Sequence, residues 1–204
     1  MSLQEINQEF DLALSKPFFL VTYHPVTAGD EDSEKTMQNL LEALDKFPGY
    51  QVLITYPNAD NGGHRLIQLL DHFSSTRKGR VYSVPSLGLK GYLSAVELCE
   101  VVIGNSSSGI IEVPSLKKPT VNIGVRQKGR LSSESVIHVG TSTEEIRAAI
   151  DRSLKKAFRQ VCETSINPYD GGETSEKIIS ILDDVCIPGS KTFHDLPVTM
   201  RGRS

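Results

Sequence analysis

The fold is decided by the stretch Val101-Val-Ile-Gly-Asn-Ser-Ser-Ser-Gly-Ile-Ile-Glu112. It begins with a short apolar run without polar alternation, which indicates a strand buried on both faces. The small polar residues that follow form a turn that opens a helix predicted over residues 109–116, with Glu112 one turn inside it. A helix that begins directly after such a strand presents free N–H groups and a positive dipole end to anions. The stretch therefore predicts a phosphate site with a carboxylate beside it.

The same order of strand and helix recurs along the chain. Strands are predicted at residues 18–21, 52–56, 81–84, 101–104, 119–123 and, from a weaker pattern, 136–139. Helices are predicted at residues 3–14, 30–47, 64–73, 90–98, 109–116, 143–158 and 173–185. Short apolar strands that alternate with amphipathic helices are typical of a parallel sheet covered on both faces. We therefore predict an α/β fold.

The bulk composition is that of an ordinary globular protein. A length of 204 residues suits one domain, predicted over residues 1–196, followed by a disordered polar tail at residues 197–204. The net charge of −3 gives no general attraction to nucleic acid or to an anionic membrane. The start of the chain lacks a signal-peptide pattern, and no apolar run approaches the ~18 residues of a membrane span. Cys99, Cys162 and Cys186 are odd in number and lack metal-ligand spacing, which predicts buried reduced thiols and a cytoplasmic location.

Unusual loops follow each of the first five predicted strands. They occupy residues 23–27, 57–63, 85–88, 105–109 and 126–130. Because the carboxyl ends of parallel strands meet at one edge of a sheet, these loops are expected to surround one ligand site. Most of them still have a simpler explanation.

Asn and Ser are the preferred caps of any helix, although the serines and the glycine at 106–109 supply more than one cap needs. Glu112 either complements the helix dipole or accepts hydrogen bonds from the vicinal hydroxyls of a ribose. Arg126 and Arg130 are either solvated charges or forked donors to a diphosphate. His24, held extended by Pro25, is either structural or a proton donor beside a leaving phosphate. No pair of histidines has metal-ligand spacing.

Five motifs in this order resemble those of the hydrolysing UDP-N-acetylglucosamine 2-epimerases, and the resemblance covers residues 18–184. They are Val21-Thr-Tyr-His-Pro-Val-Thr27, Pro57-Asn-Ala-Asp60, Gly104-Asn-Ser-Ser-Ser-Gly-Ile-Ile-Glu-Val-Pro-Ser115, Pro119-Thr-Val-Asn-Ile-Gly-Val-Arg-Gln-Lys-Gly-Arg130 and Asn167-Pro-Tyr-Asp-Gly-Gly172. The third and fourth motifs together are far more specific than a glycine-rich loop alone.

The resemblance implies the Rossmann-like C-terminal half of a GT-B fold, with its site between two halves. It implies diphosphate contacts from Ser106, Ser107 and Gly109, and ribose contacts from Glu112. Uracil would contact the segment 85–92, in particular Ser86, Leu87 and Tyr92. His24 and Arg126 would flank the diphosphate as catalytic residues, and Asn58 and Arg130 would complete the nucleotide site.

The implied reaction eliminates UDP from UDP-N-acetylglucosamine and adds water, which releases N-acetylmannosamine for sialic acid synthesis. The acidic residues of the family's N-terminal half are absent, so we expect the chain to bind UDP weakly and to be inactive alone. A homodimer is expected from the resemblance, and no metal or other cofactor is expected. Two alternatives remain: the donor half of a GT-B glycosyltransferase, and a non-catalytic flavodoxin-like interaction module.

Overall fold

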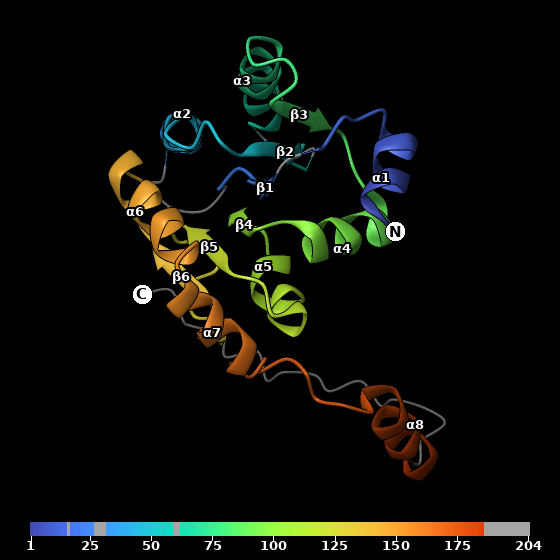
Figure 1. The fold of residues 1–204 in the computed structure, drawn as a ribbon. Helices are drawn as coiled ribbons and strands as arrows, with labels where there is room; N and C mark the ends of the chain where they lie inside the picture. Colours follow the sequence, from blue (N-terminus) through green and yellow to red (C-terminus); the bar gives the residue numbers. More distant parts are fainter. Residues whose placement is uncertain (16, 27–31, 59–61, 186–204) are drawn as a thin grey trace, which may run out of the picture. The chain divides into compact units, whose positions relative to one another are not determined.

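Parallel strands form the centre of the protein. The computed structural model describes residues 1–15, 17–26, 32–58 and 62–185, and within them six strands form one sheet in the order β3-β2-β1-β4-β5-β6 (Figure 1). All neighbouring strands are parallel. The strands are β1 (Phe18–Thr22), β2 (Gln51–Thr55), β3 (Val81–Val84), β4 (Val101–Gly104), β5 (Thr120–Ile123) and β6 (Val136–Val139). The predicted α/β fold is confirmed, and it is Rossmann-like.

Helices connect these strands, and the chain divides into two units, 1–170 and 171–204. The first unit holds α1 (Leu3–Phe10), α2 (Ser33–Asp45), α3 (Gly63–Ser75), α4 (Gly88–Leu98), α5 (Ser108–Ile111), the 3-10 helix η1 (Val113–Leu116), α6 (Thr143–Ser153) and α7 (Lys156–Thr164). The described part of the second unit holds α8 (Thr174–Asp184). Thr27, Asp60, Cys186 and the predicted tail lie outside the described residues.

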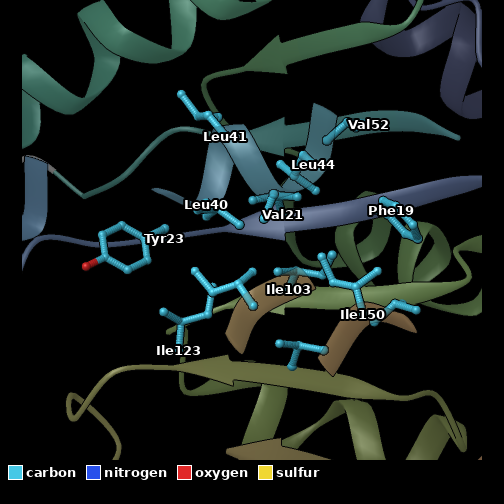
Figure 2. Packing of buried hydrophobic residues seen from close by; sticks show 14 of the residues in the cluster. Phe19, Val21, Tyr23, Leu40, Leu41, Leu44, Val52, Ile103, Ile123 and Ile150 are labelled. Carbon is cyan, nitrogen blue, oxygen red and sulfur yellow. The ribbon is translucent and has the colours of Figure 1, made fainter. Parts of the chain in front are cut away.

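Successive residues of the central strands pack into two different cores. In β1, Phe19 and Val21 belong to the core that contains residues of α2, α3, α6 and α7, whereas Leu20 belongs to the core beneath α1, α4 and η1. Figure 2 shows Phe19, Val21 and their neighbours in the first of these cores. Since side chains of a strand alternate between faces, burial on both faces explains why β1 and β4 consist almost entirely of apolar residues.

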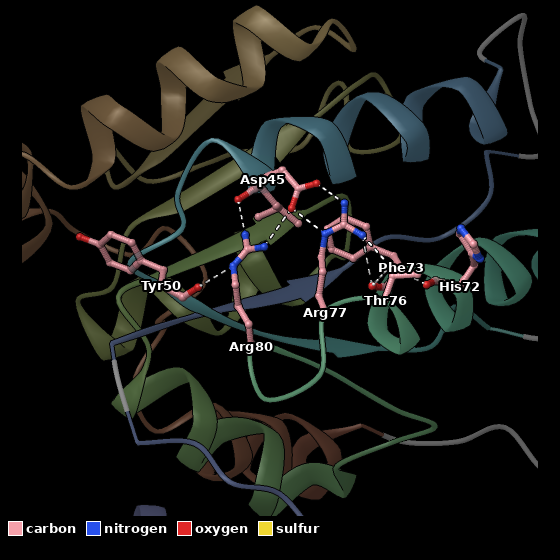
Figure 3. A network of polar contacts seen from close by, with 8 residues as sticks. Asp45, Tyr50, His72, Phe73, Thr76, Arg77 and Arg80 are labelled. Atoms are coloured by element: carbon pink, nitrogen blue, oxygen red, sulfur yellow. Dashed lines mark hydrogen bonds and ion pairs between the residues drawn. The ribbon is translucent and has the colours of Figure 1, made fainter.

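A charged network fastens the end of α2 to the connection between α3 and β3 (Figure 3). Asp45 accepts hydrogen bonds from Arg77 and from Arg80, whose Nη1 lies 2.9 Å from Oδ1. Arg77 also lies over the ring of Phe73, 3.9 Å from its centroid. Burial raises the pKa of Asp45, but the hydrogen bonds from both arginines outweigh it and leave this pKa below its usual value.

Three predicted helices are wrong in their bounds. The helix predicted at 3–14 ends at Phe10 because Asp11 adopts a left-handed conformation, with φ of 51°. The helix predicted at 143–158 is two helices, separated where Lys155 takes an extended conformation. The helix predicted at 109–116 is a single α-turn followed by a 3-10 turn. There Pro114 has no N–H for the carbonyl four residues back, so the α-helix cannot continue.

Two of the cysteines fall in the described residues, and both behave as predicted. Cys99 and Cys162 are buried free thiols. Burial raises the pKa of Cys99 to about 12 and that of Cys162 to about 11, so both stay protonated at neutral pH. Nowhere in the described ranges is a helix both long and apolar enough to cross a membrane.

Candidate functional site

A cavity of about 510 Å³ opens at the carboxyl ends of β1, β2, β3 and β4. The strand order reverses between β1 and β4, and this is the place where open parallel sheets hold their ligands. The cavity is lined by Thr22, His24, Thr55, Tyr56, Pro57, Asn58, Pro85, Ser86, Leu87, Gly88, Leu89, Tyr92, Leu93, Ser106, Ser108 and Glu112. Four of the five loops expected around one site thus contribute to the described lining, whereas the loop at 126–130 contributes no residue to it.

The close approach of β1 and β4 depends on Gly104 and Asn105. Gly104 has a φ of 138°, and a Cβ there would lie 1.9 Å from the carbonyl oxygen of Thr22, so only glycine fits. The buried side chain of Asn105 accepts from the His24 N–H at 2.7 Å and donates to the His24 carbonyl at 2.8 Å. These bonds lock the loop after β1 to the loop after β4. Asn105 therefore fixes the backbone of His24 against the loop that follows β4.

The serines after β4 differ in their surroundings. Ser106 and Ser108 line the cavity, whereas Ser107 lies outside its lining. Tyr92 from α4 forms a short hydrogen bond with the Ser108 hydroxyl. Burial raises the pKa of Tyr92 to about 12, so it stays a neutral phenol at physiological pH. The hydroxyls of Ser106, Ser108 and Tyr92 thus form one neutral polar wall.

Gly109 is needed for packing as well as for the predicted ligand contact. It does not line the cavity, and a Cβ there would lie 2.8 Å from Cγ2 of Thr120 in β5. The Thr120 hydroxyl donates to the Gly109 carbonyl at 2.9 Å. Because α5 is only four residues long, its dipole is smaller than the one expected from a helix over 109–116.

Glu112 is exposed and stands where α5 changes into η1. It lines the main cavity and also a smaller one of about 320 Å³, which it shares with Leu93, Ile111 and residues of the segment 167–170. A carboxylate on the edge of the main cavity suits an acceptor of hydrogen bonds from sugar hydroxyls. Glu112 therefore reaches the cavity edge from the junction of α5 and η1, and not from the interior of the helix predicted at 109–116.

His24 is buried beside the loop after β2. Its Nδ1 lies 3.1 Å from the backbone nitrogen of Asn58, which must be the donor. A neutral imidazole that accepts at Nδ1 carries its hydrogen on Nε2, so this geometry assigns the tautomer. His24 would then act on a ligand as an Nε2–H donor. The imidazolium expected beside a leaving phosphate stays a prediction.

The loop after β3 gives the cavity an apolar lip. Leu87 is buried directly before α4, while Leu89 is 77% exposed at the cavity edge. Ser86 caps the turn, since its Oγ accepts from the Gly88 N–H at 3.1 Å. A flat ring system could lie against the exposed Leu89 and lose water on that side, which favours a base over a charged group here.

Arg126 and Arg130 lie outside the lining of the cavity. Arg126 Nη1 donates to the Asn105 carbonyl at 3.2 Å, which places its guanidinium next to the β4 loop, while Arg130 is exposed on the turn. Among the described residues that line the cavity, none is a lysine or an arginine. Contacts of Arg126 and Arg130 with a diphosphate stay predictions.

Sequence reasoning missed several polar residues that shape the site. The hydroxyls of Thr22 and Thr55 both line the cavity and are 2.7 Å apart. Gln127 is buried and donates to the Asn105 carbonyl at 2.8 Å. A threonine at the last position of a strand, directly after three apolar residues, is the signal that could have identified Thr22 and Thr55. Nothing in the local sequence identifies the long-range partner of Gln127.

Comparison with known proteins gives one consistent group of relatives. The family described as UDP-N-acetylglucosamine 2-epimerase matches residues 1–183. GDP/UDP-N,N'-diacetylbacillosamine 2-epimerase (hydrolyzing) of Campylobacter jejuni is 32% identical over 160 residues, which are 78% of this chain and 41% of that protein. Polysialic acid biosynthesis protein P7 of Escherichia coli is 34% identical over 197 residues, covering 93% of this chain and 50% of that protein. The chain spans about half the length of the curated relatives it matches.

Solved structures agree on the fold. The UDP-GlcNAc 2-epimerase of Neisseria meningitidis, solved with UDP-GlcNAc bound, superposes with a TM-score of 0.64 at 18% identity and covers 89% of this chain and 48% of its own. ADP-heptose heptosyltransferase II of E. coli superposes with a TM-score of 0.56 at 12% identity, over 76% of this chain and 52% of its own. At these identities the likeness shows the fold, one half of the GT-B type.

Proposed function

Because the chain belongs to the UDP-N-acetylglucosamine 2-epimerase family, we propose that its cavity holds the nucleoside diphosphate of a UDP-linked N-acetylhexosamine during hydrolytic 2-epimerisation. One observation carries this proposal: the serine hydroxyls, the Glu112 carboxylate and the apolar lip at Leu87–Leu89 surround the same cavity. These are the groups that a diphosphate, a ribose and a base each require.

The hydroxyl wall is assigned to the diphosphate. Ser106, with Ser108 and Tyr92 joined by their hydrogen bond, offers hydroxyl donors on one side of the cavity. Ser107 and Gly109 remain predicted contacts through their backbone, and Arg126 and Arg130 remain predicted donors from the neighbouring turn. Glu112 is assigned to the ribose hydroxyls, and Ser86 and Leu87 to the base.

In the proposed reaction UDP leaves across C1 and C2 of the sugar. A base removes the C2 proton, the C1–O bond breaks with its electron pair going to the β-phosphate oxygen, and the resulting glycal then takes up water. The charge develops on the departing diphosphate, where pre-arranged donors stabilise the transition state. The Nε2–H of His24 and the guanidinium of Arg126 are the donors that we assign to this oxygen. Loss of one such donor typically costs about 3 kcal/mol of transition-state stabilisation.

We propose that the acidic residues for proton removal at C2 belong to a second domain, which completes the cleft. The chain alone then binds the nucleotide and turns over nothing. Purified chain should release no N-acetylmannosamine from UDP-N-acetylglucosamine. Measurable release would overturn this part of the proposal.

The sugar and the nucleotide follow the relatives. One relative is named for both GDP- and UDP-linked N,N'-diacetylbacillosamine, and another for polysialic acid biosynthesis. The first name concerns a nucleotide-linked, N-acetylated sugar and the second a sialic acid polymer, and we propose UDP-N-acetylglucosamine and sialic acid precursors as the first choice. The buried free thiols support a cytoplasmic location for such a pathway.

A thermal unfolding titration tests the nucleotide site. UDP at ~100 times its dissociation constant should stabilise the chain by about 2.7 kcal/mol, a rise in Tm of roughly 5–10 °C for a protein of this size. GDP serves as the second candidate nucleotide and AMP as the control. Equal shifts with UDP, GDP and AMP, or none with any, would refute a specific uridine or guanosine diphosphate site.

A glycosyltransferase donor half is the second candidate, favoured by the superposition with the E. coli heptosyltransferase. Product analysis of the protein together with its second domain separates the two: an epimerase releases a free 2-epimeric sugar, whereas a transferase needs an acceptor. A non-catalytic module of the same fold would show no response to UDP and would be indifferent to Glu112→Ala.

A further inference from the structure

The segment 167–170 is tied to the turn that carries Glu112. Asn167 is only 7% exposed, and its Nδ2 donates to the Ile111 carbonyl at 2.8 Å and to the Ser115 hydroxyl at 2.7 Å. These two partners stand one residue before and three residues after Glu112 in the sequence. One amide group thus spans the break between α5 and η1.

The bond with Ile111 replaces one that the break removes. In a continuous α-helix the Ser115 N–H would donate to the Ile111 carbonyl, but here it donates to the Glu112 carbonyl at 3.1 Å. The carbonyl of Ile111 is therefore left for another donor, and Asn167 supplies it. An unpartnered carbonyl in this place would favour a rearrangement of the turn.

The amide of Asn167 is itself held in one orientation. Its Oδ1 accepts from the Tyr169 N–H at 3.0 Å, and its carbonyl accepts from the Asp170 N–H at 3.1 Å. With the oxygen fixed on the Tyr169 side, the NH₂ group must face the α5–η1 turn. Asn167 is therefore a pre-organised double donor, a role that aspartate cannot fill because a carboxylate has no hydrogen to give.

We infer that Asn167 is a positioning residue that holds the carboxylate of Glu112 at the edge of the cavity, and so sets the preference for a ligand with vicinal ribose hydroxyls. This inference rests on the proposed nucleotide site. It assigns a function to the Asn167-Pro-Tyr-Asp motif, which contributes no residue to the lining of the main cavity.

The test compares UDP with 2′,3′-dideoxy-UDP by calorimetric titration of the full chain. Hydrogen bonds to a carboxylate should give the unmodified chain a preference for UDP of roughly 10- to 100-fold. Glu112→Ala should reduce this ratio to near 1. Asn167→Asp keeps the shape and the bond with the Tyr169 N–H but sets an oxygen against the Ile111 carbonyl, and it should reduce the ratio to within about threefold of the Glu112→Ala value.

Lys117→Ala is the matched control. Lys117, directly after η1, donates from its Nζ to the carbonyl of Ser165, two residues before Asn167, at 2.7 Å, and this bond does not involve the residues on either side of Glu112. It should lower the unfolding temperature and leave the ratio unchanged. A merely structural role for Asn167 would weaken binding of both ligands equally, so a wild-type ratio in Asn167→Asp overturns the inference.

If the aspartate variant fails to fold, Asn167→Ala replaces it, and circular dichroism shows whether its helix content is native. The ratio of its affinities for UDP and 2′,3′-dideoxy-UDP is then compared with the wild-type ratio in the same way. No binding of UDP by the unmodified chain would instead overturn the proposed function, and the inference with it. A preference of the unmodified chain that survives in both Asn167 variants overturns the inference alone.

Discussion

Gly109→Ala separates packing from ligand contact at the start of α5. The new Cβ would lie 2.8 Å from Cγ2 of Thr120, against the 3.4 Å or more of an ordinary contact, so α5 or Thr120 must move by about half an ångström. Thr120 is buried, and its hydroxyl is held by the Gly109 carbonyl, which leaves it little freedom. Overpacking of this kind typically costs about 1–3 kcal/mol. For a protein of this size that lowers the Tm by roughly 2–12 °C.

The double variant with Thr120→Ser makes the argument testable. Serine keeps the hydroxyl and removes the methyl group that the new Cβ meets, so it should restore about 1 kcal/mol or more to Gly109→Ala. By itself Thr120→Ser should lose about 1 kcal/mol through the missing buried methyl group. Urea unfolding of the four proteins gives the coupling energy. Additive effects of the two substitutions, with no rescue, would refute the steric explanation of Gly109.

Further substitutions address the charged network at Asp45, the Tyr92 phenol and the Arg126 guanidinium. Asp45→Asn should lower the free energy of unfolding by about 1–2 kcal/mol at pH 7 through weakened bonds with Arg77. Because the pKa of Asp45 is depressed in the folded state, the difference in unfolding free energy between wild type and variant should be full above the unfolded pKa and should vanish as pH falls through the folded pKa. A difference that stays constant down to acid pH in urea titrations would contradict this. Tyr92→Phe should weaken UDP binding several-fold, and this effect should not depend on pH below about pH 10, because burial raises the pKa of Tyr92 to about 12. A phenolate absorbance that titrates near pH 10 for every tyrosine would contradict the raised pKa of Tyr92. Arg126→Gln should weaken UDP binding by about 3- to 10-fold at low salt, and Arg126→Lys should lose less affinity because lysine keeps the charge. Equal affinities of the wild type and both variants would show that Arg126 does not contact the ligand.

The sheet is predictable because its strands carry their own signal. Val101, Val102 and Ile103 form an apolar run without polar alternation, and such a run favours a strand that is buried on both faces. The ends of helices depend on smaller and competing local effects. The helical spacing of apolar residues continues past Glu112, but Pro114 removes a hydrogen bond, and this single backbone effect decides the turn.

The candidate site is predictable where it depends on which strand a loop follows. His24, Asn58, Ser86, Ser106 and Glu112 all line one cavity because each comes directly after a strand of the sheet or within the turn beyond it. The direction of a side chain within a turn is not encoded in the same way. Arg126 and Arg130 follow β5, yet the turn points one guanidinium to a backbone carbonyl and leaves the other in solvent.

Asn105 and Asn167 show a second limit of local sequence. Each forms its decisive hydrogen bonds with a residue more than fifty positions away, or with the backbone around it. Such a partner is known only after the chain has folded. Both asparagines are buried and satisfied, and both fix backbone rather than touch the cavity, so neither residue type nor spacing distinguishes them from an ordinary turn residue.

The charge of the cavity limits what this half of a cleft can do alone. Its described lining contains one carboxylate and neither lysine nor arginine, while a nucleoside diphosphate is itself an anion. Binding must then depend on hydroxyl donors, on the Nε2–H of His24 and on the apolar lip, with the Arg126 guanidinium beside the loop after β4. Neutral donors are weaker than charged ones and respond little to salt. Affinity for UDP should therefore be modest and should fall only slightly between low and physiological salt, and a steep fall would mean that cations outside the described lining carry most of the binding.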